Sequence, residues 1–180
     1  DHPVMMLACS KLKVVPVTTH IPLKDVPNRI SKKLLTETIK ITNAAMKEKF
    51  SISEPILAIS GLNPHAGESG QLGVEEEQII IPVIRDLEGT MNIKGPLSAD
   101  TMFHPDARAK YDVAVTMYHD QALIPLKTIG FDEGVNITLG LSFIRTSPDH
   151  GTAFDLAGQN AANEASTVNA IKMAASLTRK

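Results

Sequence analysis

Short apolar runs alternate with amphipathic helical patterns along the chain, and this alternation constrains the fold more than any other feature. Extended segments are predicted at residues 4–9, 14–19, 55–62, 111–118, 135–139 and 142–146. Helices are predicted at residues 31–50, from residue 74 onward, at 121–129 and at 163–179. Strands that alternate with helices predict an α/β layered fold. Ligands bind such folds at the carboxyl ends of strands, so polar motifs there are the functional candidates.

Two helix boundaries carry their own signals. Ser31 is a plausible N-cap for the helix at residues 31–50. The helix that starts at residue 74 has three glutamates in its first turn, where the helix dipole favours negative charge. Pro82 lies inside that helix and is expected to kink it or to end it.

The composition excludes several classes of partner. A formal charge of −2 predicts no strong attraction to nucleic acid or to an anionic membrane. No apolar run approaches the roughly 18 residues that a membrane-spanning helix needs. The single cysteine, Cys9, excludes an internal disulfide, and the N-terminus lacks a signal-peptide pattern. A cytoplasmic protein is therefore expected.

Three histidines come directly after predicted strands. His20 ends the run KVVPVTTH, His65 follows PILAISGLNP, and His119 ends YDVAVTMYH. Neutral imidazoles brought together at strand ends are typical ligands of Zn, Co or Ni. Their separations of 45 and 54 residues match no local metal motif. The residues alone leave two interpretations open, a shared metal site or unrelated polar loop residues that bond to the backbone.

Residues 61–77 form the densest glycine cluster, with Gly67, Gly70 and Gly73 between a predicted strand and a predicted helix. Free backbone N–H groups in such a place suit an anion. However, the spacing G-x-x-G-x-x-G is not the dinucleotide-binding pattern, and the nearby glutamates would repel a phosphate. A cofactor loop and a tight turn that positions His65 both remain open.

Lys127, Asn136 and Arg145 carry donors suited to a phosphorylated, carboxylated substrate. Arg binds such anions through two parallel N–H groups. Each of the three, taken alone, is more often a surface or structural residue. Asp120 follows His119 directly, and it suits either a ligand-orienting or proton-transfer role or a helix N-cap.

Five longer motifs, taken together, resemble one known family. They are GLNPHAGE at residues 61–68, GPLSADTMF at 95–103, MYHDQ at 117–121, GVNITLGL at 134–141 and IRTSPDHGTAFDLAG at 144–158. The chain is similar to the 4-hydroxythreonine-4-phosphate dehydrogenase family of pyridoxal phosphate biosynthesis. Ser142 stands where the family usually has Pro, which changes loop stiffness rather than chemistry.

The resemblance implies an α/β, three-layer α/β/α fold like that of the isocitrate and isopropylmalate dehydrogenases, built from two subdomains and working as a homodimer. It covers residues 1–180 but only roughly the C-terminal half of the family protein. Part of the fold is therefore expected to be missing. The chain starts with Asp1 rather than Met, which fits either a processed chain or a piece of a longer one.

The resemblance also assigns metal ligands. His20 in THIPL, His65 in NPHAGE and His119 in YHDQ match the three histidines that hold a divalent ion (Zn, Mg or Co) in the family. The two subunits of the dimer share this site, so one chain need not display all three ligands together. Asp120 is a candidate general base, and a metal-bound hydroxide is the alternative.

Lys127, Asn136 and Arg145 match the family's substrate-contacting positions. The implied reaction is metal-dependent oxidation of 4-phosphohydroxy-L-threonine by NAD or NADP. The product, 2-amino-3-oxo-4-phosphooxybutanoate, decarboxylates to 3-amino-2-oxopropyl phosphate. The sequence does not identify the residues that bind the nicotinamide cofactor. Two alternatives stay open, a dehydrogenase of 4-phospho-threonate or erythronate and a non-catalytic fragment that binds metal and phosphate.

Overall fold

The computed structural model describes residues 2–149, 151 and 154–178. The strands are β1 (Val4–Cys9), β2 (Leu12–Pro16), β3 (Ile56–Ser60), β4 (Asn92–Leu97), β5 (Val113–Thr116), β6 (Val135–Leu139) and β7 (Arg145–Pro148). The α-helices are α1 (Val26–Arg29), α2 (Lys32–Glu48), α3 (Ile81–Leu87), α4 (Pro105–Arg108), α5 (His119–Gly130) and α6 (Ala165–Thr178). The shorter turns are η1 (Leu23–Asp25), η2 (Pro64–Gly67), the π-helix η3 (Glu76–Ile80), η4 (Phe131–Glu133) and η5 (Phe154–Leu156).

Within the described residues, seven strands form one mixed sheet in the order β4-β3-β5-β2-β1-β6-β7. The pairs β4–β3, β3–β5 and β5–β2 are parallel, whereas β1 is antiparallel to both β2 and β6, and β7 is antiparallel to β6. Parallel neighbours need crossover connections. The chain makes these through α2, α3 and α4, so β2, β3, β4 and β5 all end at the same edge of the sheet.

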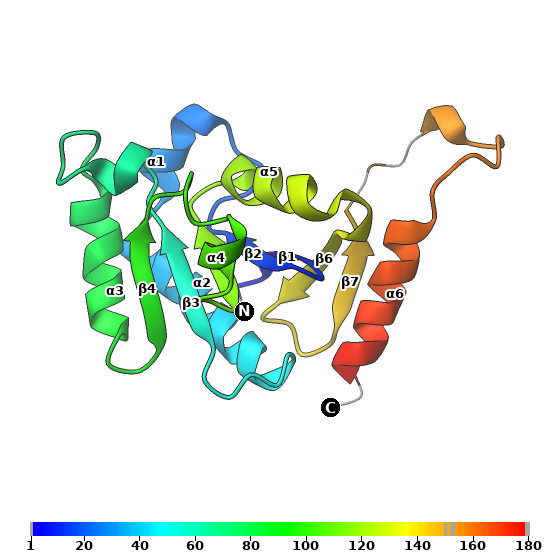
Figure 1. The fold of residues 1–180 in the computed structure, drawn as a ribbon, viewed down its shortest axis with the longest axis horizontal. Helices are drawn as coiled ribbons and strands as arrows, with labels where there is room; N and C mark the ends of the chain where they lie inside the picture. The colour runs from blue at the N-terminus through cyan, green and yellow to red at the C-terminus, as the bar shows by residue number, and fades with distance from the viewer. Residues whose placement is uncertain (1, 150, 152–153, 179–180) are drawn as a thin grey trace.

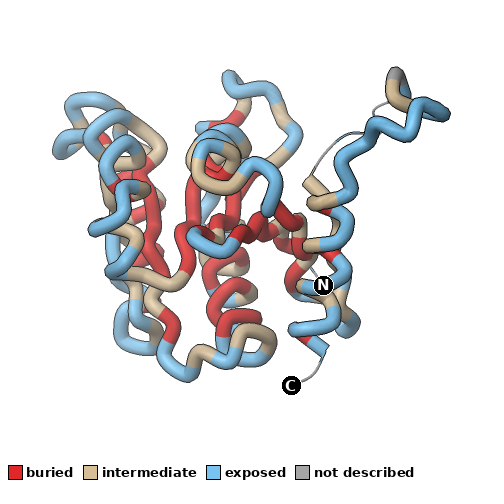
Figure 2. Tube along the Cα trace, turned by 45° about the vertical axis from the view of Figure 1, so that its right-hand side comes forward, coloured by how far each residue is buried: buried red, intermediate tan, exposed pale blue. Residues whose placement is uncertain are grey.

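Helices cover both faces of this sheet (Figure 1). On one face, α2, α3 and α6 pack on a core that includes Met6 and Ile39. On the other face, Ala122 and Leu126 of α5 pack against Leu7 of β1. The buried residues follow the strands and the inner sides of the helices (Figure 2). The predicted three-layer α/β/α architecture is confirmed.

Helix α2 shows how the sequence specifies an element. The Ser31 hydroxyl accepts a hydrogen bond from the N–H of Leu34 at 3.2 Å, as expected of an N-cap. Leu35, Ile39 and Met46 recur at helical spacing and are fully buried against the sheet. The helix ends at Glu48, two residues before the predicted end. Among the described residues, no helix is both long and apolar enough to cross a membrane.

The strands β1 and β6 have the predicted bounds, whereas β4 was not predicted. Its sequence, NIKGPL, lacks an apolar run and contains Gly95 and Pro96, which are both depleted in strands. It lies at the edge of the sheet and pairs with β3 alone, where such residues are tolerated. Strand β7 begins three residues later than the predicted segment.

Pro82 does not end its helix. The chain forms the π-helix η3 up to Ile80 and changes to the α-helix α3 at Ile81, so that Pro82 occupies the first turn of α3. The proline ring would collide with the carbonyl of Gln78 in a regular α-helix, and the wider π-turn relieves this contact. The helix therefore does not end at Pro82, and its type changes from π to α just before the proline.

Replacing a buried side chain of α2 should reveal how much the fold depends on this core. Ile39→Ala is expected to lower the free energy of unfolding by about 2–5 kcal/mol, because it leaves a cavity between α2 and the sheet. Urea denaturation followed by circular dichroism measures this. Lys40→Ala is the matched control, since Lys40 is exposed on the same helix and should change stability by less than about 0.5 kcal/mol. Equal effects of both substitutions would contradict this view of the core.

Candidate functional site

Three polar loops leave one edge of the sheet from three adjacent strands. His20 follows β2, His119 follows β5 and His65 follows β3, and these strands are neighbours in the order β3-β5-β2. Their parallel pairing places the three carboxyl ends together, as ligand sites of α/β folds require.

Hydrogen bonds continue beyond β2 and β5 and hold their two loops together. The N–H of Val17 donates to the Thr116 carbonyl at 2.8 Å. The N–H and the buried hydroxyl of Thr18 both donate to the Met117 carbonyl, at 3.2 and 2.8 Å. These bonds fix the backbone two residues before His20 and two residues before His119.

As a result, the His20 and His119 imidazoles lie beside each other. Their ring centroids are 5.3 Å apart and the rings are tilted by 49°. Two imidazoles bound to one tetrahedral ion at about 2.0–2.1 Å place their centroids about 5 Å apart, so this pair fits a divalent metal as two of its ligands. Asp120 lies 2.7 Å from Nδ1 of His119, which leaves Nε2 of that ring available. A carboxylate on the second ring nitrogen is the usual partner of a metal-binding histidine.

Asp120 is therefore a partner of His119 rather than a helix cap. The N-cap of α5 is Tyr118, which makes no side-chain cap, and Asp120 lies in the first turn. Its side chain is 69% exposed, so it can exchange protons with solvent or with a bound ligand.

His65 is held apart from this pair. Its imidazole is 67% exposed, and its Nδ1 lies 3.5 Å from the Glu68 carboxylate. Among the described residues, no group of three or more His, Cys, Asp or Glu side chains is close enough to hold a metal ion. The assignment of His65 as the third metal ligand stays a prediction.

The glycine-rich loop is a left-handed turn. All six residues from 65 to 70 have positive φ, and four of them, including His65, are not glycine. Each non-glycine residue in this region costs of the order of 1 kcal/mol. Such a turn persists only where contacts with surrounding residues stabilise it. The contacts of this loop therefore determine where His65 lies.

Asn63 anchors the start of the turn. Its side-chain amide donates to Glu75 at 2.7 Å and to Glu76 at 2.9 Å, using both N–H groups. The hydrogen bond from Asn63 holds the pKa of the Glu75 carboxyl below its usual value. The glutamates of this helix, which the sequence suggested only as charges favoured by the dipole, thus shape the loop that carries His65.

Gln121 ties the His65 loop to the His119 loop. It is 9% exposed, and its Oε1 accepts the Met117 N–H at 2.7 Å and the Ser60 hydroxyl at 3.0 Å. Its Nε2 donates to the Gly61 carbonyl at 2.9 Å. One buried amide therefore fixes the ends of β3 and β5 relative to α5.

Shallow surface depressions connect the histidine pair to Lys127. His119 and Asp120 line one depression together with His20, and they line the next together with Lys127. His119 and Lys127 are eight residues apart on α5, which separates them by about 12 Å along the helix axis. The Lys127 ammonium lies 3.4 Å from the Asp149 carboxylate, and its side chain stays 37% exposed.

Asn136 lies on the same side of the sheet as α5. It is directly opposite Leu7, which packs against α5, and opposite strand residues point to the same face. The Asn136 side chain makes no hydrogen bond within the described part of the chain. Its donors and acceptor are therefore free for a ligand.

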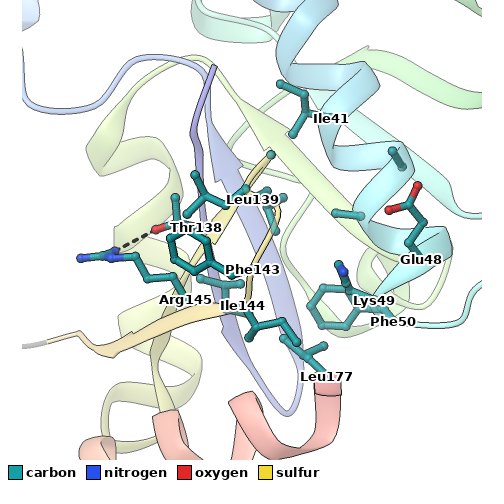
Figure 3. Close-up of a pocket in the computed structure, with 15 residues that line it drawn as sticks. Ile41, Glu48, Lys49, Phe50, Thr138, Leu139, Phe143, Ile144, Arg145 and Leu177 are labelled. Atoms are coloured by element: carbon teal, nitrogen blue, oxygen red, sulfur yellow. Dashed lines mark hydrogen bonds between the residues drawn. The ribbon is translucent and has the colours of Figure 1, made fainter. Parts of the chain in front are cut away.

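Arg145 lies on the same face of the sheet as Asn136, but it lines a different cavity. It is opposite Thr138 in the β6–β7 pair, and its Nη1 donates to the Thr138 hydroxyl at 2.8 Å. Figure 3 shows the guanidinium pointing away from an apolar cavity of about 140 Å³ that Phe143 and Ile144 help to line. This cavity shares no lining residue with the depressions along α5.

Two residues that position the site, Glu76 and Gln121, were missed from the sequence. Glu76 is 1% exposed and lies four residues before the buried Ile80, on the apolar face of its helix. Gln121 stands next to Ala122, which faces the core from α5. A charged residue on the apolar side of a helical pattern was the signal that could have found Glu76, whereas Gln121 carried no such signal.

Taken together, the fold and site define an α/β protein whose candidate ligand site lies at the carboxyl edge of a mixed sheet. The chain belongs to the PdxA family, since the family model described as "Pyridoxal phosphate biosynthetic protein PdxA" matches residues 1–174. A curated relative from Roseobacter denitrificans, named 4-hydroxythreonine-4-phosphate dehydrogenase, is 58% identical over 178 residues. The match covers 98% of this chain and 55% of the relative, so the chain spans about half the length of the relatives it matches.

Solved structures give the same family. The 4-hydroxythreonine-4-phosphate dehydrogenase of Klebsiella pneumoniae aligns with a TM-score of 0.89 at 38% identity, over 98% of this chain and 54% of that one. The corresponding enzyme from Burkholderia phymatum aligns with a TM-score of 0.86 at 44% identity, over the same shares of the two chains. The expected family and the expected partial fold are therefore confirmed.

Gln121→Leu tests the hydrogen bonds that join the two loops. The substitution removes a buried amide and leaves the Gly61 carbonyl and the Met117 N–H without partners, which should cost about 2–5 kcal/mol of unfolding free energy. Urea denaturation measures this cost. Gln78→Leu, at an exposed position, is the control and should change stability by less than about 0.5 kcal/mol. A Gln121 variant as stable as the control would show that these hydrogen bonds do not contribute to the free energy of unfolding.

Proposed function

We propose that this chain provides the metal and substrate half of a 4-hydroxythreonine-4-phosphate dehydrogenase. The proposed reaction oxidises the C3 alcohol of 4-phosphohydroxy-L-threonine, with NAD or NADP as the electron acceptor. The β-keto acid formed, 2-amino-3-oxo-4-phosphooxybutanoate, then loses CO₂ to give 3-amino-2-oxopropyl phosphate. The observation that carries this proposal is the His20–His119 pair with Asp120 bonded to it, at the carboxyl edge of the sheet.

The histidine pair supports a divalent cofactor such as Zn, Mg or Co. Two imidazoles at this separation fit one ion, which would polarise the substrate hydroxyl and lower its pKa. Asp120 orients the His119 ring through Nδ1. The same exposed carboxylate is the chain's candidate for accepting the hydroxyl proton.

We propose that three residues beyond the pair hold the substrate anions. Lys127 lies along α5 from His119, and its charge would neutralise phosphate. Arg145 would bind phosphate or carboxylate through its paired N–H groups, and the unpartnered Asn136 amide would bond to a substrate oxygen. In the proposed complex, fixing both ends of a short acid would hold its reacting carbon in one orientation.

We further propose that the working protein is a homodimer with shared metal sites. The support is that His65 is largely exposed and is not grouped with His20 and His119 within the described residues of one chain. In a dimer, His65 of one copy would complete the pair of the other. A dimer of this kind would give each site three imidazole ligands, a set that some catalytic zinc sites have.

Turnover of the chain tests the proposed reaction. The 180-residue chain is mixed with NAD or NADP, Zn or Co and 4-phosphohydroxy-L-threonine, and reduced cofactor is followed by absorbance. The relative from Roseobacter denitrificans serves as the reference enzyme. We expect reduction of the cofactor, with 4-phospho-threonate and 4-phospho-erythronate as poorer substrates. A large preference for those acids would favour the alternative dehydrogenase instead.

The second candidate function is binding without catalysis. It is favoured by one observation, that the chain spans about half the length of its curated relatives. Turnover comparable to that of the reference enzyme would exclude it. Metal and phosphate binding with no turnover would establish it in place of the enzymatic proposal.

His65→Ala tests the third metal ligand. We expect the variant to lose stoichiometric Zn or Co binding, because two imidazoles alone hold the ion weakly. Elemental analysis after gel filtration gives the metal content per chain. His104→Ala is the matched control, since His104 lies in an exposed loop away from the pair, and it should bind metal like the unsubstituted chain. Unchanged metal content in the His65 variant would reject the three-histidine site.

A further inference from the structure

Glu76 is a buried carboxylate that no step of the proposed reaction uses. It is 1% exposed and forms no ion pair with any described residue. Burying a charged group without a counter-ion is unfavourable unless hydrogen bonds replace its water. The hydrogen-bond donors around the Glu76 carboxylate therefore indicate its role.

Those donors all belong to the start of the loop that carries His65. Oε1 of Glu76 accepts the backbone N–H groups of Leu62 and Asn63, at 2.7 and 2.8 Å. Oε2 accepts the Asn63 side-chain amide at 2.9 Å. Three N–H groups from two consecutive residues thus converge on one carboxylate, and the left-handed turn begins two residues later at His65.

The loop is shaped around this carboxylate. A β-carbon at Gly61 would lie 2.9 Å from Oε1, and one at Gly67 would lie 2.7 Å from Oε2, so both positions have room only for glycine. Gly67 also has a φ of +83°, within the run of positive φ values. The carboxylate therefore contacts the turn at its entry and in its middle.

The π-helix brings the carboxylate to this place. Glu76 is the first residue of η3, whose wider turn precedes Pro82. Short π-turns within helices recur at functional sites. The Glu76 side chain lies on the buried side of this helix, together with Ile80.

We propose that Glu76 is a positioning residue for His65: its buried carboxylate holds the backbone of residues 62 and 63 and thereby keeps the left-handed turn in place. The part of this proposal that concerns metal rests on the proposed function, because it takes His65 as a ligand. The part that concerns the backbone stands on the contacts alone.

Glu76→Gln is the direct test, with Glu77→Gln as the matched control. Both remove one negative charge from the same helical turn, but Glu77 is exposed, and among the described residues it makes no hydrogen bond with Leu62 or Asn63. Glu76→Gln keeps one carbonyl oxygen and places an NH₂ group against the amide of Asn63. If Glu76→Gln fails to fold, Glu76→Asp takes its place, since it keeps the charge and withdraws the carboxylate by one methylene.

Two readouts separate positioning from general stability. Amide hydrogen exchange by NMR should speed up at least 10-fold at Leu62 and Asn63 in Glu76→Gln, with no change at Val115 in the core. Titration with Co²⁺ should show at least 10-fold weaker binding. In a His65→Ala background, where His20 and His119 alone would bind Co²⁺ weakly, the same Glu76 substitution should leave the dissociation constant of this residual binding unchanged, because Glu76 acts through His65.

Each result decides the matter. Unchanged exchange at Leu62 and Asn63 would overturn the proposal, and so would equal effects of the Glu76 and Glu77 substitutions. A further loss of Co²⁺ affinity in the His65→Ala background would also overturn it, since Glu76 would then act by another route. If His65→Ala alone leaves Co²⁺ binding intact, the proposed function loses its third ligand. The exchange data then decide whether Glu76 holds the turn.

Discussion

Parallel pairing of β3, β5 and β2 is the constraint on which the candidate site depends. It sends three loops, each with a histidine, over the same edge of the sheet. The hydrogen bonds of Thr18 extend this pairing past the strand ends, so that His20 and His119 meet. The three histidines are far apart in the sequence and belong to no local motif. The parallel pairing of their strands is what brings them to the same edge of the sheet.

Two buried polar side chains then fix the positions of the loops at this edge of the sheet. Gln121 joins the ends of β3 and β5 to α5, and Glu76 holds the entry to the left-handed turn. Both are costly to bury, and each of their side-chain polar atoms has a hydrogen-bond partner, as a rigid buried polar network requires. α5 connects the parts, since it carries His119, Gln121 and Lys127.

The sequence predicted what depends on local pattern. The bounds of β1 and β6, the Ser31 cap and the α/β layering followed from periodicity and capping chemistry, whereas the three-layer arrangement came from the family resemblance. β4 was missed because an edge strand tolerates glycine and proline. The role of Glu76 was missed because a run of glutamates at a helix start has a sufficient local explanation in the helix dipole. The residues alone raised the site candidates, the resemblance assigned their roles, and only the structure shows which of them lie together.

The proposal that His20 and His119 hold a divalent ion at this edge has a direct crystallographic test. Anomalous X-ray diffraction at the zinc edge, on crystals of the zinc-loaded chain, tests it most directly. The account predicts one strong peak per chain, bonded to both imidazoles at about 2.0–2.1 Å, with a His65 ring completing the set. A peak bonded to other residues, or no peak between these two rings, would contradict it.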